Sequence, residues 1–181
     1  MVFSVLIILA VGCAPLTAQQ QADLAEVRAF VATVIQVYGL PPVPVRVEEE
    51  MGMRAATYKD GIISISPRTL RATPWRDVIL AHEVAHHLLG HDGPLGLGWD
   101  GESQVQQREL DADAKAVEIL QRVRGLTENE AFRLVYDAHW SLQRAVGTTP
   151  FVVPLGHPAP CVKLADLIKR FPAQQAWARA C

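Results

Sequence analysis

The sequence has no long run of charge of one sign. Its 181 residues carry 17 Lys and Arg against 19 Asp and Glu, which gives a net charge of -2. Proteins that bind nucleic acid through its phosphates need a basic surface, so we exclude nucleic acid as a partner. The chain also has no internal repeat, no low-complexity tract and no linker between domains. One domain with a proper hydrophobic core is therefore expected.

Charge is missing altogether from the first 20 residues. The apolar run Val2 to Val11 has about the length of a signal-peptide core and is too short to span a bilayer. We predict an export signal over residues 1–18 and a single mature domain over 22–181. Cys13 lies in a segment that resembles a lipobox, whereas Ala18 ends a site for ordinary signal peptidase, and both routes remain open. The expected location is the bacterial periplasm, with membrane association if Cys13 is lipidated.

Cysteine is scarce, with three residues in the chain. If Cys13 is lipidated or removed, Cys161 and Cys181 remain as a pair in an oxidising compartment, where disulfides persist. We expect these two residues to form a bridge that closes a loop of about 20 residues and contributes roughly 3 kcal/mol. Two unpaired thiols are the alternative.

Hydrophobic spacing predicts a mixed α+β protein with a small antiparallel or mixed sheet packed on several helices. Residues 19–21 are expected to be a polar linker. Pro41, Pro42 and Pro44 stop the first helix, glycine and proline mark loops at 91–101 and 147–158, and Asp60-Gly61 predicts a hairpin turn. The predicted helices cover residues 24–39, 74–89, 102–124, 127–142 and 162–170, and the predicted strands cover 43–47, 55–58 and 62–66. Pro44 favours a sheet edge for the first strand.

The central motif is H-E-x-x-H, formed by His82, Glu83 and His86. On a helix the two histidines fall on one face, one turn apart, which is the spacing that two imidazoles need to bind one zinc ion. Glu83 lies about 100° round the helix from His82, close enough to reach a water on the metal. Such a carboxylate can take the proton of that water.

A catalytic zinc site needs a third protein ligand. Asp92 occupies the position of the third metzincin ligand, but the glycine of that motif stands one residue late, at Gly90. The better candidate is Glu109 on the following helix. Asp113 lies four residues later on the same face, where it would accept the outer N–H of a ligating histidine. We expect Asp111 to point elsewhere.

These motifs, H-E-V-A-H followed by E-L-D-A-D, resemble the gluzincin signature, and more narrowly the HtpX-like and CaaX-prenyl-protease-like zinc metallopeptidases. The resemblance covers about residues 55 to 170 and implies a thermolysin-like fold in minimal form. It also implies one zinc ion on His82, His86 and Glu109, with Glu83 as general base and Asp113 behind the ligands. A later His-Pro in that family helps to stabilise the oxyanion together with an arginine. His157 matches this histidine, whereas Lys163 stands where the family has the arginine.

The function implied is an exported zinc endopeptidase that hydrolyses peptide or unfolded-protein substrates. The rival hypothesis is a zinc-binding or chaperone-like protein that keeps the scaffold but does not cut. The strand Ile62 to Ser66 is a candidate for pairing with an extended substrate, if it lies at a sheet edge. We expect no ligation by His87, and ligation by His91 only after a local break of the helix. Aromatic residues are expected in the core or at the rim of the site: Tyr58, Trp75, Trp99, Tyr136 and Trp140.

Overall fold

The chain forms a mixed α+β fold that is mostly helical, as the computed structural model shows for residues 15–49, 51, 54–71, 75–91, 102–146 and 157–179. The predicted α+β class is therefore confirmed. In chain order the elements are α1 (Ala18–Tyr38), β1 (Val45–Val47), β2 (Ala56–Lys59), β3 (Ile62–Ile65), α2 (Pro67–Leu70), α3 (Trp75–Leu88), α4 (Glu102–Arg124), α5 (Glu128–Val146), α6 (Pro160–Arg170) and the 3-10 helix η1 (Pro172–Trp177).

The sheet has three strands in the order β1-β3-β2 and is of the mixed kind. Strand β1 runs parallel to β3, and β2 runs antiparallel to it. Asp60 and Gly61 both have positive φ angles, 51° and 73°, as the predicted two-residue hairpin turn requires. The proline-flanked strand β1 lies at an edge, as expected. Strand β3 is paired on both sides, so Ile62 to Ser66 does not lie at an edge and the condition for pairing with a substrate is not met.

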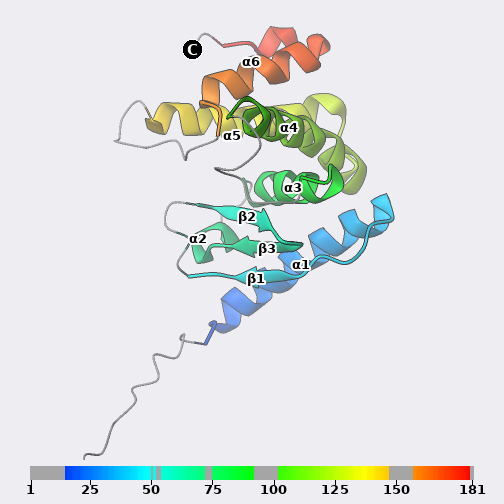
Figure 1. Ribbon diagram of the computed structural model, residues 1–181, viewed down its shortest axis with the longest axis vertical. Coiled ribbons are helices and arrows are strands. Elements are labelled where there is room, and N and C mark those ends of the chain that lie inside the picture. The colour runs from blue at the N-terminus through cyan, green and yellow to red at the C-terminus, as the bar shows by residue number, and fades with distance from the viewer. Residues whose placement is uncertain are drawn as a thin grey trace, which may run out of the picture.

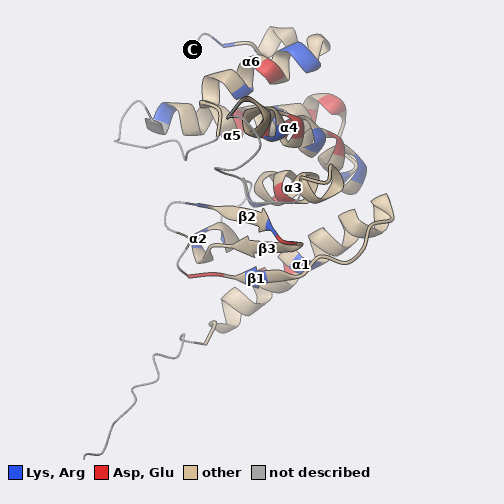
Figure 2. Ribbon diagram, in the orientation of Figure 1, with Lys and Arg blue, Asp and Glu red and all other residues tan. Residues whose placement is uncertain are grey.

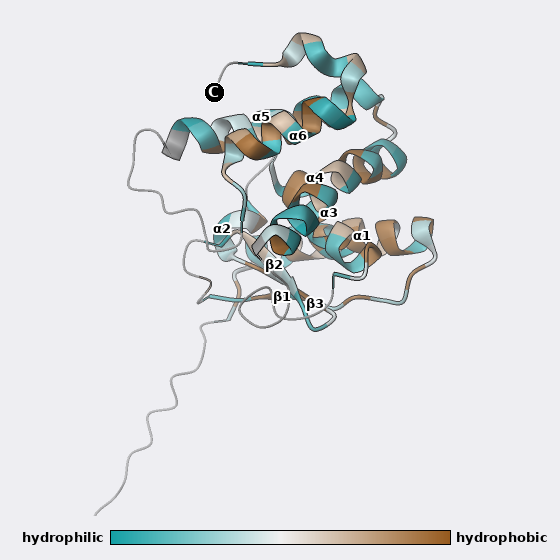
Figure 3. Ribbon diagram, turned by 45° about the horizontal axis from the view of Figure 1, so that its top comes forward, coloured by the Kyte–Doolittle hydropathy of each residue, from teal (hydrophilic) through white to brown (hydrophobic). Residues whose placement is uncertain are grey.

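Helix α3 lies between the sheet and the layer of α4, α5 and α6, whereas α1 lies beside the sheet (Figure 1). Helix α3 contacts β2 on one side and α4 on the other, and α5 and α6 continue the helical layer beyond α4. Fully buried alanines on both helices allow α3 and α4 to approach closely: Ala81, Ala85, Ala112 and Ala116. In Figure 3, helices α5 and α6 carry hydrophobic and hydrophilic residues on different sides, as helices that cover a core must.

Helix α1 begins earlier than the sequence suggested. Thr17 caps it, and a capping box with Gln20 satisfies the first backbone N–H groups. The predicted linker over residues 19–21 is therefore wrong, because the polarity of this stretch belongs to an exposed first turn of helix. None of the helices in the described ranges is both long and apolar enough to cross a membrane.

Helix α6 begins at Pro160, two residues before its predicted start, because proline fits the first turn of a helix. The short helices α2 and η1 were not predicted. Cys161 is disulfide-bonded, whereas Cys13 and Cys181 lie outside the described residues, so the predicted bridge between Cys161 and Cys181 stays a prediction. Helix α5 has the predicted capping box, with Thr127 and Glu130 bonded to each other.

Charged side chains of both signs are interspersed along the helices (Figure 2). Ion pairs link neighbouring elements: Arg76 of α3 contacts Glu26 of α1 at 2.7 Å, and Arg170 of α6 contacts Asp111 of α4 at 2.7 Å. Asp111 is not among the side chains that could hold a metal ion, which agrees with the expectation that it points elsewhere.

Candidate metal centre

The two histidines of the H-E-x-x-H motif face the same side of α3. His82 and His86 are one turn apart, and their Nε2 atoms lie 3.1 Å from each other. The side chain of His82 is 14% exposed and that of His86 is 4% exposed. The sequence spacing thus places both imidazoles on one face of α3, and packing buries that face.

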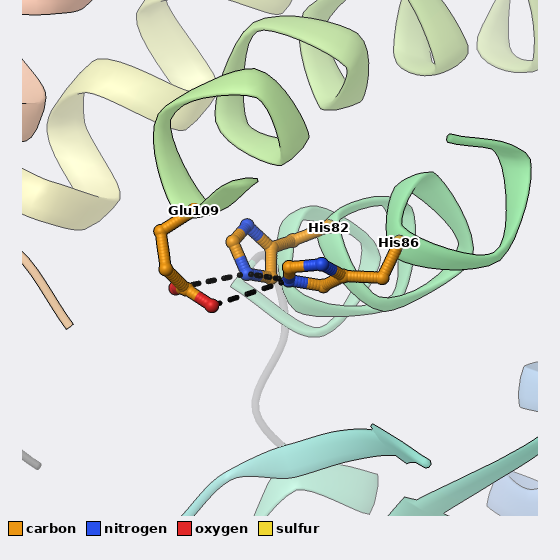
Figure 4. A group of neighbouring side chains, drawn as sticks. All are labelled: His82, His86 and Glu109. Carbon is orange, nitrogen blue, oxygen red and sulfur yellow. Dashed lines mark hydrogen bonds and ion pairs between the residues drawn. The ribbon is translucent and has the colours of Figure 1, made fainter. Parts of the chain in front are cut away.

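Glu109 of α4 completes the group. Its Oε1 lies 3.3 Å from Nε2 of His86, and its Oε2 lies 3.5 Å from Nε2 of His82. Figure 4 shows the carboxylate facing the two imidazoles across the gap between the helices. The three side chains form a group that could hold a metal ion, with one ligand atom from each within 4.8 Å of the others. The structure therefore brings together the three residues expected to bind the metal.

Each imidazole is oriented by a contact at its outer nitrogen. Nδ1 of His82 lies 2.7 Å from Oδ1 of Asp113, and Nδ1 of His86 lies 3.0 Å from Nδ1 of His91. Where both Nδ1 atoms donate, both Nε2 atoms turn lone pairs toward the Glu109 oxygens. Four acceptor atoms at one buried point need a cation or a proton among them. The donor set therefore fits a metal ion.

His91 reaches His86 because the chain turns back at the end of α3. Gly90 has a φ angle of 65°, and the N–H of His91 donates to the carbonyl of His86 at 2.9 Å. This is the bond pattern of a Schellman cap, in which glycine tolerates the left-handed conformation. Gly90, which stands one residue later than the metzincin glycine, therefore forms a helix cap that brings His91 beside His86, a candidate metal ligand. Asp92, the metzincin alternative, lies outside the described residues.

Sequence reasoning missed His139 of α5. Its Nε2 lies 3.1 Å from Oδ1 of Asp113, the oxygen that also contacts His82. The available signal was weak: His139 follows the buried residues Val135 and Tyr136 at helical spacing, so it continues a stripe that faces the core. The inner face of α5 is rotated by about one residue from the predicted one, since Phe132 and Tyr136 are buried.

Glu83 is buried beside this group, with 8% of its surface exposed. The backbone N–H of Tyr58, on the edge strand β2, donates to its carboxylate. Burial, together with the negative charge of Glu109, raises the pKa of Glu83, although His82 and the Tyr58 bond oppose this shift. A carboxylate with a raised pKa is better suited to accept a proton near neutral pH.

His157 and Lys163 both lie against Glu109. Nδ1 of His157 is 2.7 Å from Oε2 of Glu109, and Nζ of Lys163 is 3.2 Å from the same oxygen. The His157 side chain is 37% exposed, whereas that of Lys163 is 8% exposed. The structure thus brings both residues to the centre, but His157 is partly exposed to solvent and Lys163 is buried. Their expected part in oxyanion stabilisation stays a prediction.

The charges of the centre depend on one another. Burial disfavours ionised Glu109, but hydrogen bonds from His157, His82 and His86 outweigh this effect and hold the pKa of its carboxyl far below the usual range. Burial likewise opposes ionised Asp113, and the nearby positive charges of His139, Lys163 and His82 hold its pKa well below the ordinary value. Both carboxylates are therefore anionic at neutral pH.

His87 does not belong to the metal-binding group. Its Nδ1 bonds the hydroxyl of Tyr58 at 2.8 Å, and the two rings meet edge to face. Tyr58 and Tyr136 are core residues, as expected, with 5% and 2% of their surfaces exposed. The expectation that His87 is not a ligand agrees with this contact.

Comparison with known proteins identifies no family for this chain, since no family model, no curated protein and no solved structure matches it. The function of this chain is therefore inferred from the centre itself.

Proposed function

We propose that the protein is a zinc-dependent endopeptidase of the gluzincin type. The single observation that supports this most directly is the joining of His82, His86 and Glu109 at one buried point, with the carboxylate of Glu83 beside them. The H-E-x-x-H motif supplies two of these candidate ligands. Glu109, expected from the sequence as the third, lies beside them on another helix.

Zinc is a metal whose geometry fits the separations of these atoms. A tetrahedral ion with ligand bonds of about 2.0 to 2.1 Å separates its donor atoms by about 3.3 Å. The two Nε2 atoms here are 3.1 Å apart, and each lies 3.3 or 3.5 Å from a different oxygen of Glu109. Two imidazoles and one carboxylate are also the ligand set of several catalytic zinc sites, which keep a fourth position for water.

The proposed reaction is the hydrolysis of a peptide bond. A bound zinc ion would polarise the scissile carbonyl and lower the pKa of water at the site. Glu83 would take one proton from the attacking water and pass it to the departing amine, so that the carboxylate is regenerated. His157, which is partly exposed beside Glu109, would donate a hydrogen bond to the oxyanion.

An extended substrate would add to the edge strand β2 rather than to β3. The hairpin register makes Lys59 and Thr57 the residues that exchange hydrogen bonds with β3, so the backbone groups of Ala56 and Tyr58 point away from β3. The Tyr58 N–H bonds Glu83, and the substrate would pair with the other outward groups. The bond from Tyr58 to Glu83 places this edge beside the centre. Zincins of the thermolysin-like type combine such an edge with an H-E-x-x-H helix, and we propose that β2, α3 and α4 form a minimal version of that arrangement.

Export remains part of the proposal. The disulfide at Cys161 supports an oxidising compartment such as the bacterial periplasm, because disulfides rarely persist in the cytosol. Lipid attachment at Cys13 would tie the domain to a membrane surface. This residue lies outside the described ranges.

The test is hydrolysis of an unfolded protein by the purified chain. We expect cleavage that stops when a chelator removes the metal and returns when one equivalent of zinc is added, with metal content measured in each sample. A chain that binds zinc but cuts no member of a broad peptide library would favour the rival function, a zinc-binding or chaperone-like protein. A chain that binds no zinc would contradict both hypotheses.

Zinc binding is expected to release about one proton from His82 near neutral pH. Burial opposes a charge on His82, but Asp113 and Glu109 outweigh burial and raise its pKa to about 10 in the metal-free protein. The metal needs the lone pair of Nε2, so it competes with this proton. The apparent affinity should therefore rise about tenfold per pH unit up to the pKa of His82. Calorimetric titrations in buffers of different ionisation enthalpy count the protons, and a count of zero would contradict the assignment.

A further inference from the structure

Lys163 joins the two carboxylates of α4. Its Nζ lies 3.2 Å from Oε2 of Glu109 and 3.0 Å from Oδ2 of Asp113. Glu109 belongs to the metal-binding group, and Asp113 orients the imidazole of His82. One ammonium group therefore contacts both the third metal ligand and the residue that positions the first.

The two carboxylates need this cation. Glu109 and Asp113 lie one turn apart on the buried face of α4, with 1% and 3% of their surfaces exposed. Oδ1 of Asp113 contacts His82 and His139, whereas Oδ2 contacts Lys163. Buried anions without a counter-charge are strongly destabilising, and a lysine ammonium can contact two acceptors at once through its three N–H groups.

The position of Lys163 does not suit contact with a substrate. A group that stabilises an oxyanion has to face the open side of the metal, where the substrate carbonyl enters. The side chain of Lys163 is only 8% exposed and is directed at the two carboxylates, while His157 beside it is 37% exposed. The hydrogen bonds of Lys163 are thus given to the protein itself.

Helix α6 holds Lys163 in this place. Leu164 and Leu167 of the same helix are buried in the core, and Cys161 near its first turn is disulfide-bonded. Helix α6 contacts both α4 and α5. The packing of α6 therefore fixes the lysine relative to the face of α4 that carries the carboxylates.

We propose that Lys163 is a positioning residue that ties Glu109 to Asp113 and thereby sets the zinc affinity of the centre, and that it does not touch the substrate. This inference rests on the proposed zinc centre and extends it. Residues that orient metal ligands typically change metal affinity by 10- to 100-fold when they are replaced. The effect of Lys163 should therefore appear in zinc binding before it appears in catalysis.

The test compares Lys163→Met with Lys169→Met, a matched change at an exposed position of the same helix. Zinc dissociation constants are measured by competition with a chromophoric chelator, and hydrolysis is measured at saturating zinc. We expect Lys163→Met to bind zinc 10 to 100 times more weakly, to approach the wild-type kcat once saturated, and Lys169→Met to match the wild type. Wild-type zinc affinity in Lys163→Met, combined with a lower kcat at saturation, would overturn the inference and favour oxyanion stabilisation.

Lys163→Arg provides a second test, which holds even if the methionine variant does not fold. It keeps the charge, but a planar guanidinium does not place its donors at the same point between two carboxylates. We expect zinc affinity to fall by several-fold at an unchanged saturated kcat. A changed kcat at wild-type zinc affinity would again overturn the inference. A wild-type protein that binds no zinc would overturn the proposed function as well, so the two failures are distinguishable.

Discussion

Glu83→Gln is expected to leave the protein loaded with zinc and to lower kcat for peptide hydrolysis by about 10²- to 10⁴-fold, the usual contribution of a general base. Glutamine has the size of glutamate and can still accept the N–H of Tyr58. It cannot take a proton from water. The loss should therefore fall on the chemical step, with little change in KM.

The surroundings of Glu83 allow this substitution to test catalysis separately from metal binding. Glu83 does not belong to the group of side chains that could hold the metal. Glutamine is neutral, so it avoids the cost of burying a charge, the same cost that raises the pKa of the native carboxyl. Zinc affinity should consequently stay within a few-fold of the wild type, and the fold should be at least as stable.

Activity on an unfolded protein and zinc content are to be measured on the same preparation. Glu118→Gln is the matched control, because this residue of α4 has a side chain that is 45% exposed and pairs with Lys115 on the surface. The control should behave as the wild type. Unchanged cleavage by Glu83→Gln at full zinc loading would contradict the proposed mechanism.

Features that depend on local spacing were predictable from the sequence. The pair His82 and His86, and the pair Glu109 and Asp113, each fall one helical turn apart, so their shared faces follow from helix geometry. The hairpin at Asp60-Gly61 and the capping box at Thr127 depend on equally local chemistry. That α3 meets α4 at these faces was an inference from the motif, and the structure agrees with it.

Features that depend on packing between distant segments were not predictable. The parallel pairing of β1 with β3 places β3 in the centre of the sheet, which no local pattern of residues 62–66 could show. His139 reaches Asp113 only because α5 packs beside α4. Lysine side chains are usually exposed to solvent. Lys163 is buried because α6 places it over two acidic groups.

Glu109→Gln should have the largest effect on the metal. The amide is a poor zinc ligand, so the site is left with two histidines, which is incomplete for a catalytic zinc ion. We expect zinc affinity to fall by more than about 100-fold, the upper end of the losses seen when only a supporting residue is changed. Hydrolysis should disappear at ordinary zinc concentrations and return only in part at high zinc.

The same substitution should also destabilise the metal-free protein. The Glu109 carboxylate contacts His82, His86, His157 and Lys163, and it is 1% exposed. Breaking a buried ion pair from one side costs about 3 to 5 kcal/mol. We expect a loss near 3 kcal/mol, at the low end, because Asp113 still compensates the charge of Lys163.

Chelator competition and urea unfolding of the metal-free chain measure the two effects separately. Asp111→Asn is the matched control on α4, since it also removes one negative charge but weakens partly exposed contacts with Arg170 and Gln107, and the ion pair is worth about 0 to 1 kcal/mol. Its zinc affinity should equal that of the wild type. If Glu109→Gln kept wild-type zinc affinity, the third ligand would be another residue, such as Asp92 of the metzincin alternative, which lies outside the described residues. A loss of zinc in Asp92→Ala would then identify it.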